Sequence, residues 1–353
     1  MLQSVLRAYG LNQDLFKVTA FGSGLINYTW RIKNHHEDYI LQRINNTVFK
    51  QPLAIAHNIQ NIAEYLQQHH PEYLFVTPIK TTTGEEIFQD ENEGYFRLFP
   101  FVSNSHTIDV VQSPMQAYEA AKQFGKFTKL LSGFDHSQLK ITLPDFHNLS
   151  LRYDQFKQSL IYGNEERVKE AAATIYLMKQ HTYIVDEYEK IKTDPDFKIR
   201  VTHHDTKISN ILFDESSNGL CVIDLDTVMP GYFISDVGDM MRTYLSPASE
   251  EEKDFSAINV REEFYKAIVE GYGSEMKDEL TSTEKKYFVY AGKFMIYMQA
   301  LRFLSDYLNN DIYYGSKYPG HNFVRANNQL ALLQRLLEKE KLFSKISKQL
   351  LKT

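Results

Sequence analysis

Oxygen-bearing side chains gather around one segment of the chain, VTHHDTKISNILFDESSNGLCVIDLD at residues 201–226. Asp205 is followed five residues later by Asn210, and Asp224 stands near the end of the segment. Apolar runs on either side of the polar turn DESSNG predict a β-hairpin. Because the second strand of a hairpin runs back beside the first, Asp224 is expected to return next to the loop of Asp205 and Asn210.

Three such side chains in one place suit phosphoryl transfer. A carboxylate at Asp205 can accept the proton of a hydroxyl group, while Asn210 and Asp224 offer the oxygen ligands that Mg²⁺ prefers when it is bound to nucleotide phosphates. Each residue alone would more often be a turn or capping residue. The joint spacing, together with the hairpin, therefore carries the interpretation.

The pattern H-x-D-x-x-x-x-N followed by D-x-D resembles the catalytic and metal-binding segments of the kinase-like phosphotransferases, which include aminoglycoside phosphotransferases, choline kinases and protein kinases. HHDTKISNILFD together with VIDLDTVMPG is similar, more narrowly, to the N-acetylhexosamine 1-kinases. The resemblance implies ATP as donor, Asp205 as the catalytic acid–base residue, Lys207 beside the transferring phosphate, and Mg²⁺ on Asn210 and Asp224. It also implies that Asp236 supports the catalytic loop from behind.

A glycine-containing turn lies near the start of the chain, in FGSGLINYTWRI. Glycine lets backbone amides approach a phosphate closely, although a plain hairpin turn is the default interpretation of G-S-G alone. In a kinase-like chain, Gly22, Ser23 and Gly24 are expected to cover the nucleotide phosphates. The sequence has no Walker-type motif, which disfavours a P-loop NTPase.

The third predicted strand, YILQRI at residues 39–44, carries Gln42 and Arg43 where protein kinases have a phosphate-binding lysine. Strand neighbours face opposite sides, so only one of the two can face the nucleotide. The resemblance places Gln42 nearest to the family position, but Arg43 is the only cation of the strand and is the residue we expect there. Glu64, on a helix predicted over residues 54–69, is a candidate partner for that cation, or simply a solvated residue.

The segment GYFRLFPFV at residues 94–102 is expected to end the first lobe. By resemblance it is the hinge, where Phe99, Pro100, Phe101 and Val102 would bind adenine; the alternative is a core strand that runs into a loop. Residues 1–103 are rich in predicted strands, and residues 104–353 are mainly helical. We therefore expect an α+β, two-lobed protein-kinase-like fold with the nucleotide between the lobes.

Aromatic and charged residues are mixed near the C-terminus. The segment RFLSDYLNNDIYY, followed by HNFVRA, resembles the part that closes the sugar pocket of hexosamine kinases, which implies Arg302, Asp306, Tyr313 and Arg325 as substrate residues. Aromatic faces suit the apolar side of a pyranose. The alternative for Arg302 and Asp306, at i and i+4, is a salt bridge on one helix face.

The composition is that of a soluble globular protein: 353 residues, 43% hydrophobic and 24% charged. A net charge of −6 disfavours nucleic acid or an anionic membrane as the main partner. The single cysteine, Cys221, suits a reducing compartment, and neither a signal peptide nor a membrane span is evident. A cytoplasmic location is expected.

The sequence thus predicts an ATP-dependent small-molecule kinase, with the anomeric hydroxyl of an N-acetylhexosamine as the expected acceptor. One alternative is a kinase of aminoglycosides, choline or another amine-bearing alcohol, which would need an acidic pocket. A second alternative is a pseudokinase that binds nucleotide as a scaffold. The unusual Gln42 and Arg43 pair supports the pseudokinase, and the intact Asp205, Asn210 and Asp224 weigh against it.

Overall fold

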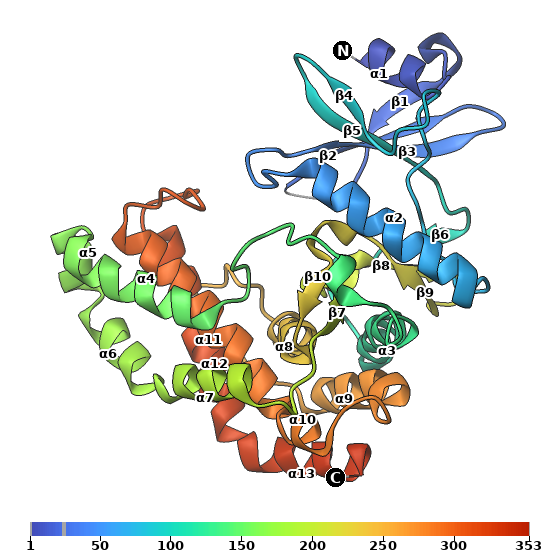
Figure 1. The fold of residues 1–353 in the computed structure, drawn as a ribbon. Coiled ribbons are helices and arrows are strands. Elements are labelled where there is room, and N and C mark those ends of the chain that lie inside the picture. The colour runs from blue at the N-terminus through green and yellow to red at the C-terminus, as the bar shows by residue number, and fades with distance from the viewer. Residues whose placement is uncertain (1, 23–25, 353) are drawn as a thin grey trace.

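The computed structural model describes residues 2–22 and 26–352, which form a small sheet-rich lobe above a larger helical lobe (Figure 1). The expected α+β, two-lobed kinase-like fold is confirmed. The last long strand of the small lobe ends at Pro100 and the next long helix begins at Pro114; the division expected at residue 103 stays a prediction.

Among the described residues, five strands form the antiparallel sheet of the N-terminal lobe, in the order β1-β2-β3-β5-β4. A short helix, α1, covers the sheet, and its Val5 and Leu6 pack with Ile32, Leu41 and Leu98 in a small core of their own. The elements are α1 (Leu2–Ala8), β1 (Lys17–Ala20), β2 (Tyr28–Lys33), β3 (Asp38–Ile44), β4 (Phe88–Asp90) and β5 (Gly94–Pro100).

Helix α2 (Pro52–His69) confirms the helix predicted over residues 54–69. Its apolar stripe, which includes Ile55, Ile59 and Ile62, is buried in the core of the larger lobe rather than in that of the sheet. Asn58 fixes this position, because its amide donates to the backbone carbonyls of Lys140 and Val228, at 2.8 and 3.0 Å. Helix α2 is therefore attached to the lobe that carries the catalytic hairpin.

The C-terminal lobe packs its helices around α11, of which the greater part is buried. Helix α8 packs against α11 and follows directly after the hairpin region (Figure 1). The helices are α3 (Pro114–Leu130), α4 (Leu149–Tyr162), α5 (Glu165–Glu170), α6 (Ala172–Gln180), α7 (Tyr183–Thr193), α8 (Phe233–Tyr244), α9 (Glu262–Met276), α10 (Ser282–Lys286), α11 (Phe288–Leu308), α12 (His321–Glu338) and α13 (Glu340–Leu351).

The predicted hairpin is confirmed: β8 (Ile211–Asp214) pairs antiparallel with β9 (Gly219–Val222), and β6 (Ser105–His106) adds to its edge. The carboxylate of Asp214 accepts hydrogen bonds from the backbone amides of Ser216 and Asn218, which closes the turn. A second small ladder joins β7 (Arg200–Thr202) to β10 (Met229–Gly231). Together these short strands bring residues 203–210 and 223–227 to the same side of the lobe.

None of the helices formed by residues 2–22 and 26–352 has the length and apolar character needed to cross a membrane.

Candidate active site

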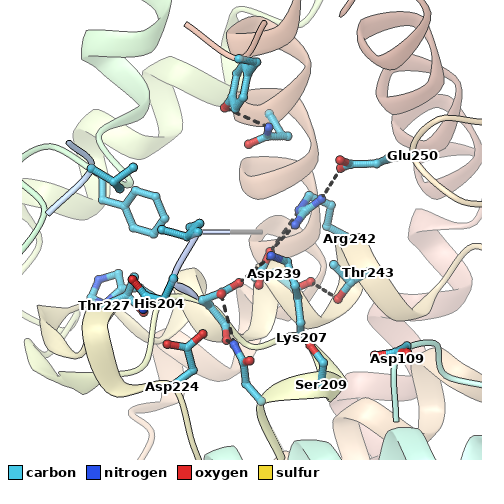
Figure 2. Close-up of a pocket in the computed structure, with 18 of the residues that line it drawn as sticks. Asp109, His204, Lys207, Ser209, Asp224, Thr227, Asp239, Arg242, Thr243 and Glu250 are labelled. Atoms are coloured by element: carbon cyan, nitrogen blue, oxygen red, sulfur yellow. Dashed lines mark hydrogen bonds and ion pairs between the residues drawn. The ribbon is translucent and has the colours of Figure 1, made fainter. Parts of the chain in front are cut away.

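A cavity of about 2350 Å³ lies between the lobes and is lined by residues of both. Its walls come from the glycine turn, β3, β5 and the hinge on one side, and from the hairpin, α8 and α11 on the other. Figure 2 shows a pocket of the structure with Asp224, Lys207 and Asp239 among the side chains that line it. The hairpin segment that the sequence singled out therefore faces the cavity.

The loop after β7 is held from behind by two carboxylates of α8. The backbone amides of His203 and His204 donate to Asp236, at 3.0 and 2.7 Å, and the amide of Thr206 donates to Asp239 at 2.9 Å. The predicted supporting role of Asp236 is confirmed. Burial raises the pKa of Asp236 to about 7, and the two amide hydrogen bonds oppose that rise. The loop conformation thus depends on α8.

Asp205 stands at the front of this loop. Its carboxylate lies 3.2 Å from the Nζ atom of Lys207 and accepts a hydrogen bond of 3.1 Å from the Nδ2 atom of Asn210. Burial alone would raise the pKa of Asp205, but the charge of Lys207 and these hydrogen bonds hold it below its ordinary value. Asp205 is therefore ionised at neutral pH and can accept a hydrogen bond, or a proton, from a hydroxyl group.

Asp224 and Asn210 present free oxygens to the cavity. Asp224 adopts a left-handed backbone conformation (φ 59°, ψ 62°) at the end of the returning strand, and its side chain is accessible from the cavity. Loss of bulk water, followed by the negative charges of Asp226 and Asp205, raises the pKa of Asp224. Neither its carboxylate nor the Oδ1 atom of Asn210 accepts a hydrogen bond from the described residues.

This donor set fits a hard cation, because a divalent ion would offset the repulsion between the carboxylates of Asp224, Asp226 and Asp205. Within the described part of the chain, no group of three His, Cys, Asp or Glu side chains is arranged to hold a metal alone. Asp224 and Asn210 are the residues of this site that would hold such an ion, and their role as metal ligands stays a prediction.

The sheet places Gln42, not Arg43, on the cavity wall. Arg43 lies on the opposite face of β3, where it forms an ion pair of 3.3 Å with Glu93 and packs over the ring of Tyr28. This placement corrects the expectation for Arg43, and its cause is strand alternation. Glu64 is exposed on α2, where it accepts a hydrogen bond from Gln60 and forms no ion pair with a residue that the structure describes.

The buried cation of this wall is Arg97 of β5, which the sequence analysis did not identify. Arg97 lies opposite Gln42 in the sheet and donates to its Oε1 atom, at 2.9 and 3.1 Å. Its Nη1 atom is 2.5 Å from the Oδ1 atom of Asp226 in the other lobe. The sequence did contain a sign of this role, because Arg97 is the only charged residue in an otherwise apolar and aromatic strand, GYFRLFP.

The glycine turn is connected to the same acid. Asn27 donates to Asp226 at 2.7 Å and accepts a hydrogen bond of 3.0 Å from the amide of Asn45. Gly22 lines the cavity with φ +80°, a conformation that favours glycine. Ser23 and Gly24 lie outside the described residues, so their expected role stays a prediction.

The expected hinge residues Phe99, Pro100, Phe101 and Val102 all line the cavity. Apolar side chains lie near them on both lobes, so a flat aromatic base could be enclosed between Ile26 and Ile40 on one side and Leu212 and Ile223 on the other. Phe101 is fixed by the guanidinium of Arg31, which lies 3.9 Å from its ring centroid. Binding of adenine by these four residues stays a prediction, and the backbone amide of Phe101 already donates to the carbonyl of Asp38 at 3.0 Å.

The expected substrate residues have separate roles. Arg302, Tyr313 and Arg325 line the cavity, and Tyr313 is 73% exposed. Asp306 also borders it, but its carboxylate accepts hydrogen bonds from the backbone amides of Tyr313 and Tyr314, at 2.7 and 2.9 Å, and from Asn322 at 3.0 Å. Asp306 therefore holds the loop that carries Tyr313, and its oxygens are not free for a ligand. The alternative of a salt bridge with Arg302 is not found, since the described contacts of Arg302 include no ion pair.

A chain of ion pairs, also missed from the sequence, crosses the floor of the cavity. Asp239 contacts Arg242 at 2.9 Å, Arg242 contacts Glu250 at 3.1 Å, and Glu250 contacts Arg325 (Figure 2 shows the first two contacts). Burial would raise the pKa of Glu250, but Arg242 and Arg325 hold it below its ordinary value. Burial raises the pKa of Asp239, and the charge of Arg242 opposes that rise. Both acids of this chain are already paired with arginines.

The fold and the cavity together define a kinase-like phosphotransferase. The sequence matches the phosphotransferase enzyme family over residues 17–281, and the chain belongs to that family. It is therefore a phosphotransferase enzyme.

Solved structures share the whole fold at low sequence identity. An aminoglycoside phosphotransferase from Alicyclobacillus acidocaldarius is 12% identical, with a TM-score of 0.65 and coverage of 100% of this chain and 96% of that one. A microcompartment-associated aminopropanol kinase is 15% identical, with a TM-score of 0.65 and 97% coverage of both chains. An amicoumacin kinase in complex with AMP-PNP, Ca²⁺ and its antibiotic is 14% identical, with a TM-score of 0.61 and coverage of 95% and 92%.

Proposed function

We propose that this kinase transfers the γ-phosphoryl group of ATP to the anomeric hydroxyl of an N-acetylhexosamine. The observation that carries the transfer itself is the convergence of Asp205, Asn210 and Asp224 at one end of the cavity between the lobes. The hinge residues support ATP as donor, and the similar fold of a kinase that was solved with AMP-PNP agrees with this.

The roles follow from the geometry. Asp205, ionised and beside Lys207, orients the acceptor hydroxyl and takes its proton, while Lys207 offsets negative charge on the transferring group. Asn210 and Asp224 would hold Mg²⁺, which, when bound, neutralises charge on the nucleotide phosphates. Arg97 and Asn27 hold Asp226 and so fix β5 and the start of β2 relative to the hairpin.

The acceptor side of the cavity supports a sugar over a cationic, amine-bearing acceptor. An amine-bearing alcohol, such as the substrate of the aminopropanol kinase, needs carboxylates that are free to pair with it. Here Asp239 and Glu250 are occupied by Arg242 and Arg325. The exposed ring of Tyr313, and Tyr314 4.8 Å from it, offer the aromatic surface that suits a pyranose.

A pseudokinase scaffold is the second candidate, and the observation that favours it is Gln42 on the cavity wall where a lysine would grip phosphates. Against it, the hydrogen bonds to Asp236 and Asp239 preserve the conformation of the loop that carries Asp205. A scaffold that only binds nucleotide would have no need of an ionised, accessible Asp205.

The test is ADP release with ATP, Mg²⁺ and a panel of N-acetylhexosamines, plain hexoses, aminoglycosides and amino alcohols, with the product position read by NMR. We expect a 1-phosphate from an N-acetylhexosamine, and a loss of kcat on the order of 100-fold or more in Asp205→Asn with little change in nucleotide affinity. Asp154→Asn, at an exposed position of α4, is the matched control. A folded Asp205→Asn enzyme with the parent rate, or nucleotide binding without turnover on any acceptor, would rule the proposal out.

A further inference from the structure

The charged residues on the acceptor wall fall into two groups. Most are paired: Glu250 lies between Arg242 and Arg325, and Lys317 contacts Glu251 at 2.7 Å. These pairs leave little net charge for a ligand. Three charged residues of this wall form no ion pair in the described part of the chain: Asp306, whose carboxylate is held by amide groups, and two arginines, Arg152 of α4 and Arg302 of α11.

Neither arginine forms an ion pair with a carboxylate in the described part of the chain. Arg152 donates to the side chain of Gln155 at 3.0 Å and to the backbone carbonyl of Asp145 at 2.9 Å, and its buried Nε atom has no hydrogen-bond partner. Arg302 has a long hydrogen bond of 3.4 Å to Gln299. The charge of Asp145 acts on Arg152, but the Asp145 carboxylate accepts a hydrogen bond from Asn148 and forms no ion pair with Arg152.

Aromatic rings surround Arg302. The guanidinium carbon of Arg302 lies 5.7 Å from the ring centroid of Phe146, 5.9 Å from that of Tyr313 and 5.5 Å from that of Tyr314. Such a cation–π contact fixes the plane of a guanidinium and leaves its N–H groups free to donate. The positive charge is therefore positioned before any ligand arrives.

The two guanidinium groups also act on one another and on their neighbour His147. Burial, and then the charge of Arg302, lower the pKa of Arg152. Burial, followed by positive neighbours that include Arg302 and Arg152, lowers the pKa of His147 well below its ordinary value. His147 is thus neutral at neutral pH and adds no positive charge to that of the two arginines. The charges of Arg152 and Arg302 repel one another in a partly buried cavity, and an anion bound beside them would relieve this repulsion.

We propose that Arg152 and Arg302 bind an anionic substituent of the acceptor, a carboxylate, phosphate or sulfate, while the hydroxyl to be phosphorylated lies at Asp205. This inference rests on the proposed function and narrows its substrate class to an acidic or phosphorylated or sulfated sugar. Guanidinium groups suit such oxyanions because their N–H donors match the spacing of two anion oxygens. The rings of Phe146, Tyr313 and Tyr314 lie beside Arg302 and would contact the body of the sugar.

The experiment compares acceptors that differ only in charge. kcat/KM is measured for N-acetylglucosamine, its 6-sulfate and its 6-phosphate, and for glucose against glucuronic acid, so the three kinds of anion are separated. We expect at least one anionic sugar to exceed its neutral counterpart by about tenfold or more. In Arg302→Gln and Arg152→Gln that preference should disappear, while kcat/KM for the neutral sugar should change much less. Arg335→Gln, at an exposed ion pair with Glu338 on α12, is the matched control.

Calorimetric binding of the same sugars separates this proposal from the kinase proposal. If a charged sugar binds and the arginine variants abolish that binding, the anion subsite stands even when no sugar is turned over and the proposed function fails. If neutral sugars are phosphorylated but anionic sugars gain nothing, or if the variants lose neutral and anionic sugars equally, the subsite is wrong and the kinase assignment is unaffected. Arg302→Lys, which keeps the charge, and circular dichroism of every variant guard against a loss caused by misfolding.

Discussion

Arg97 of the N-terminal lobe and Asp226 of the C-terminal lobe form an ion pair of 2.5 Å across the cavity wall, with side chains only 1% and 2% exposed. The same acid accepts a hydrogen bond from Asn27, next to the glycine turn, and the same arginine donates to Gln42. These contacts link β3, β5, the glycine turn and the hairpin. The ion pair thus sets how the phosphate-binding side of one lobe faces the catalytic side of the other.

We expect Arg97→Met to destabilise the protein by about 3–5 kcal/mol, because it leaves Asp226 buried without its counter-ion. The KM for ATP should also rise, because the glycine turn and β5 lose their common attachment. Asp226→Asn should have a smaller effect on stability, and a double-mutant cycle should show strong coupling between the two sites. Denaturant unfolding and ATP titration measure both effects.

Arg43→Gln is the matched control, since Arg43 lies on the neighbouring strand but on the opposite face of the sheet. Its ion pair with Glu93 is partly exposed, with side chains 34% and 28% accessible, and such pairs contribute about 0–1 kcal/mol. The KM for ATP should stay at the parent value. An Arg43→Gln enzyme that bound ATP as poorly as Arg97→Met would contradict the placement of these two cations.

The parts of the site that could be predicted from the sequence are those fixed by local pattern. The hairpin follows from two apolar runs around a polar turn, and its pairing brings Asp224 back beside Asp205 and Asn210. The helix of Asp236 begins shortly after the hairpin, so a supporting role could be inferred from order along the chain. These features involve residues that lie close together in the sequence.

The parts that could not be predicted depend on contacts between distant segments. Alternation shows that Gln42 and Arg43 face opposite sides of β3, but only packing of the sheet against the other lobe decides which side is the cavity. Arg97 looked like one polar residue in a core strand until β5 was placed beside β3 and opposite Asp226. Asp306 likewise could not be distinguished from a substrate ligand without the loop that folds onto it.

Asp306→Ala should affect the acceptor and spare the nucleotide. The substitution removes the oxygens that hold the backbone amides of Tyr313 and Tyr314, so the loop should lose its fixed position over the cavity. We expect the KM for the acceptor to rise by about tenfold, the order of two lost hydrogen bonds to a charged group, and the KM for ATP to change little. Asp186→Ala, at an exposed position of α7, is the control, and a rise in both KM values would show a general loss of structure instead.

Removal of divalent cations should abolish turnover, and Mg²⁺ should restore it. Asp224→Asn should lower kcat on the order of 100-fold and raise the Mg²⁺ concentration needed for half-maximal rate, because the variant removes the charge of a cation ligand. Asn210→Ala should raise the Mg²⁺ requirement as well. Asp278→Asn, on the surface after α9, is the control and should leave kcat and the Mg²⁺ requirement unchanged. A normal Mg²⁺ dependence in Asp224→Asn would place the cation elsewhere.

Burial of His204 makes the stability of the catalytic loop sensitive to acid. His204 lies between Thr202 and the tight approach of Gly231, and burial lowers the pKa of His204 to about 4 from an ordinary value near 6.5. The unfolded chain therefore binds a proton more readily than the folded protein. The contribution of neutral His204 to the free energy of unfolding is fully present above pH 6.5. It is lost progressively as the pH falls toward 4, by roughly 3 kcal/mol in all.

His204→Asn tests this account, because asparagine tolerates the positive φ of 66° at this position and does not titrate. The variant should be less stable at pH 7.5, where it loses packing, but its free energy of unfolding should fall less steeply than that of the parent between pH 6.5 and 4.5. Urea unfolding at half-unit pH steps measures the slope, with His35→Asn in an exposed turn as the control. Parallel curves for the parent and His204→Asn would mean that another group titrates on unfolding, because only the buried imidazole was removed.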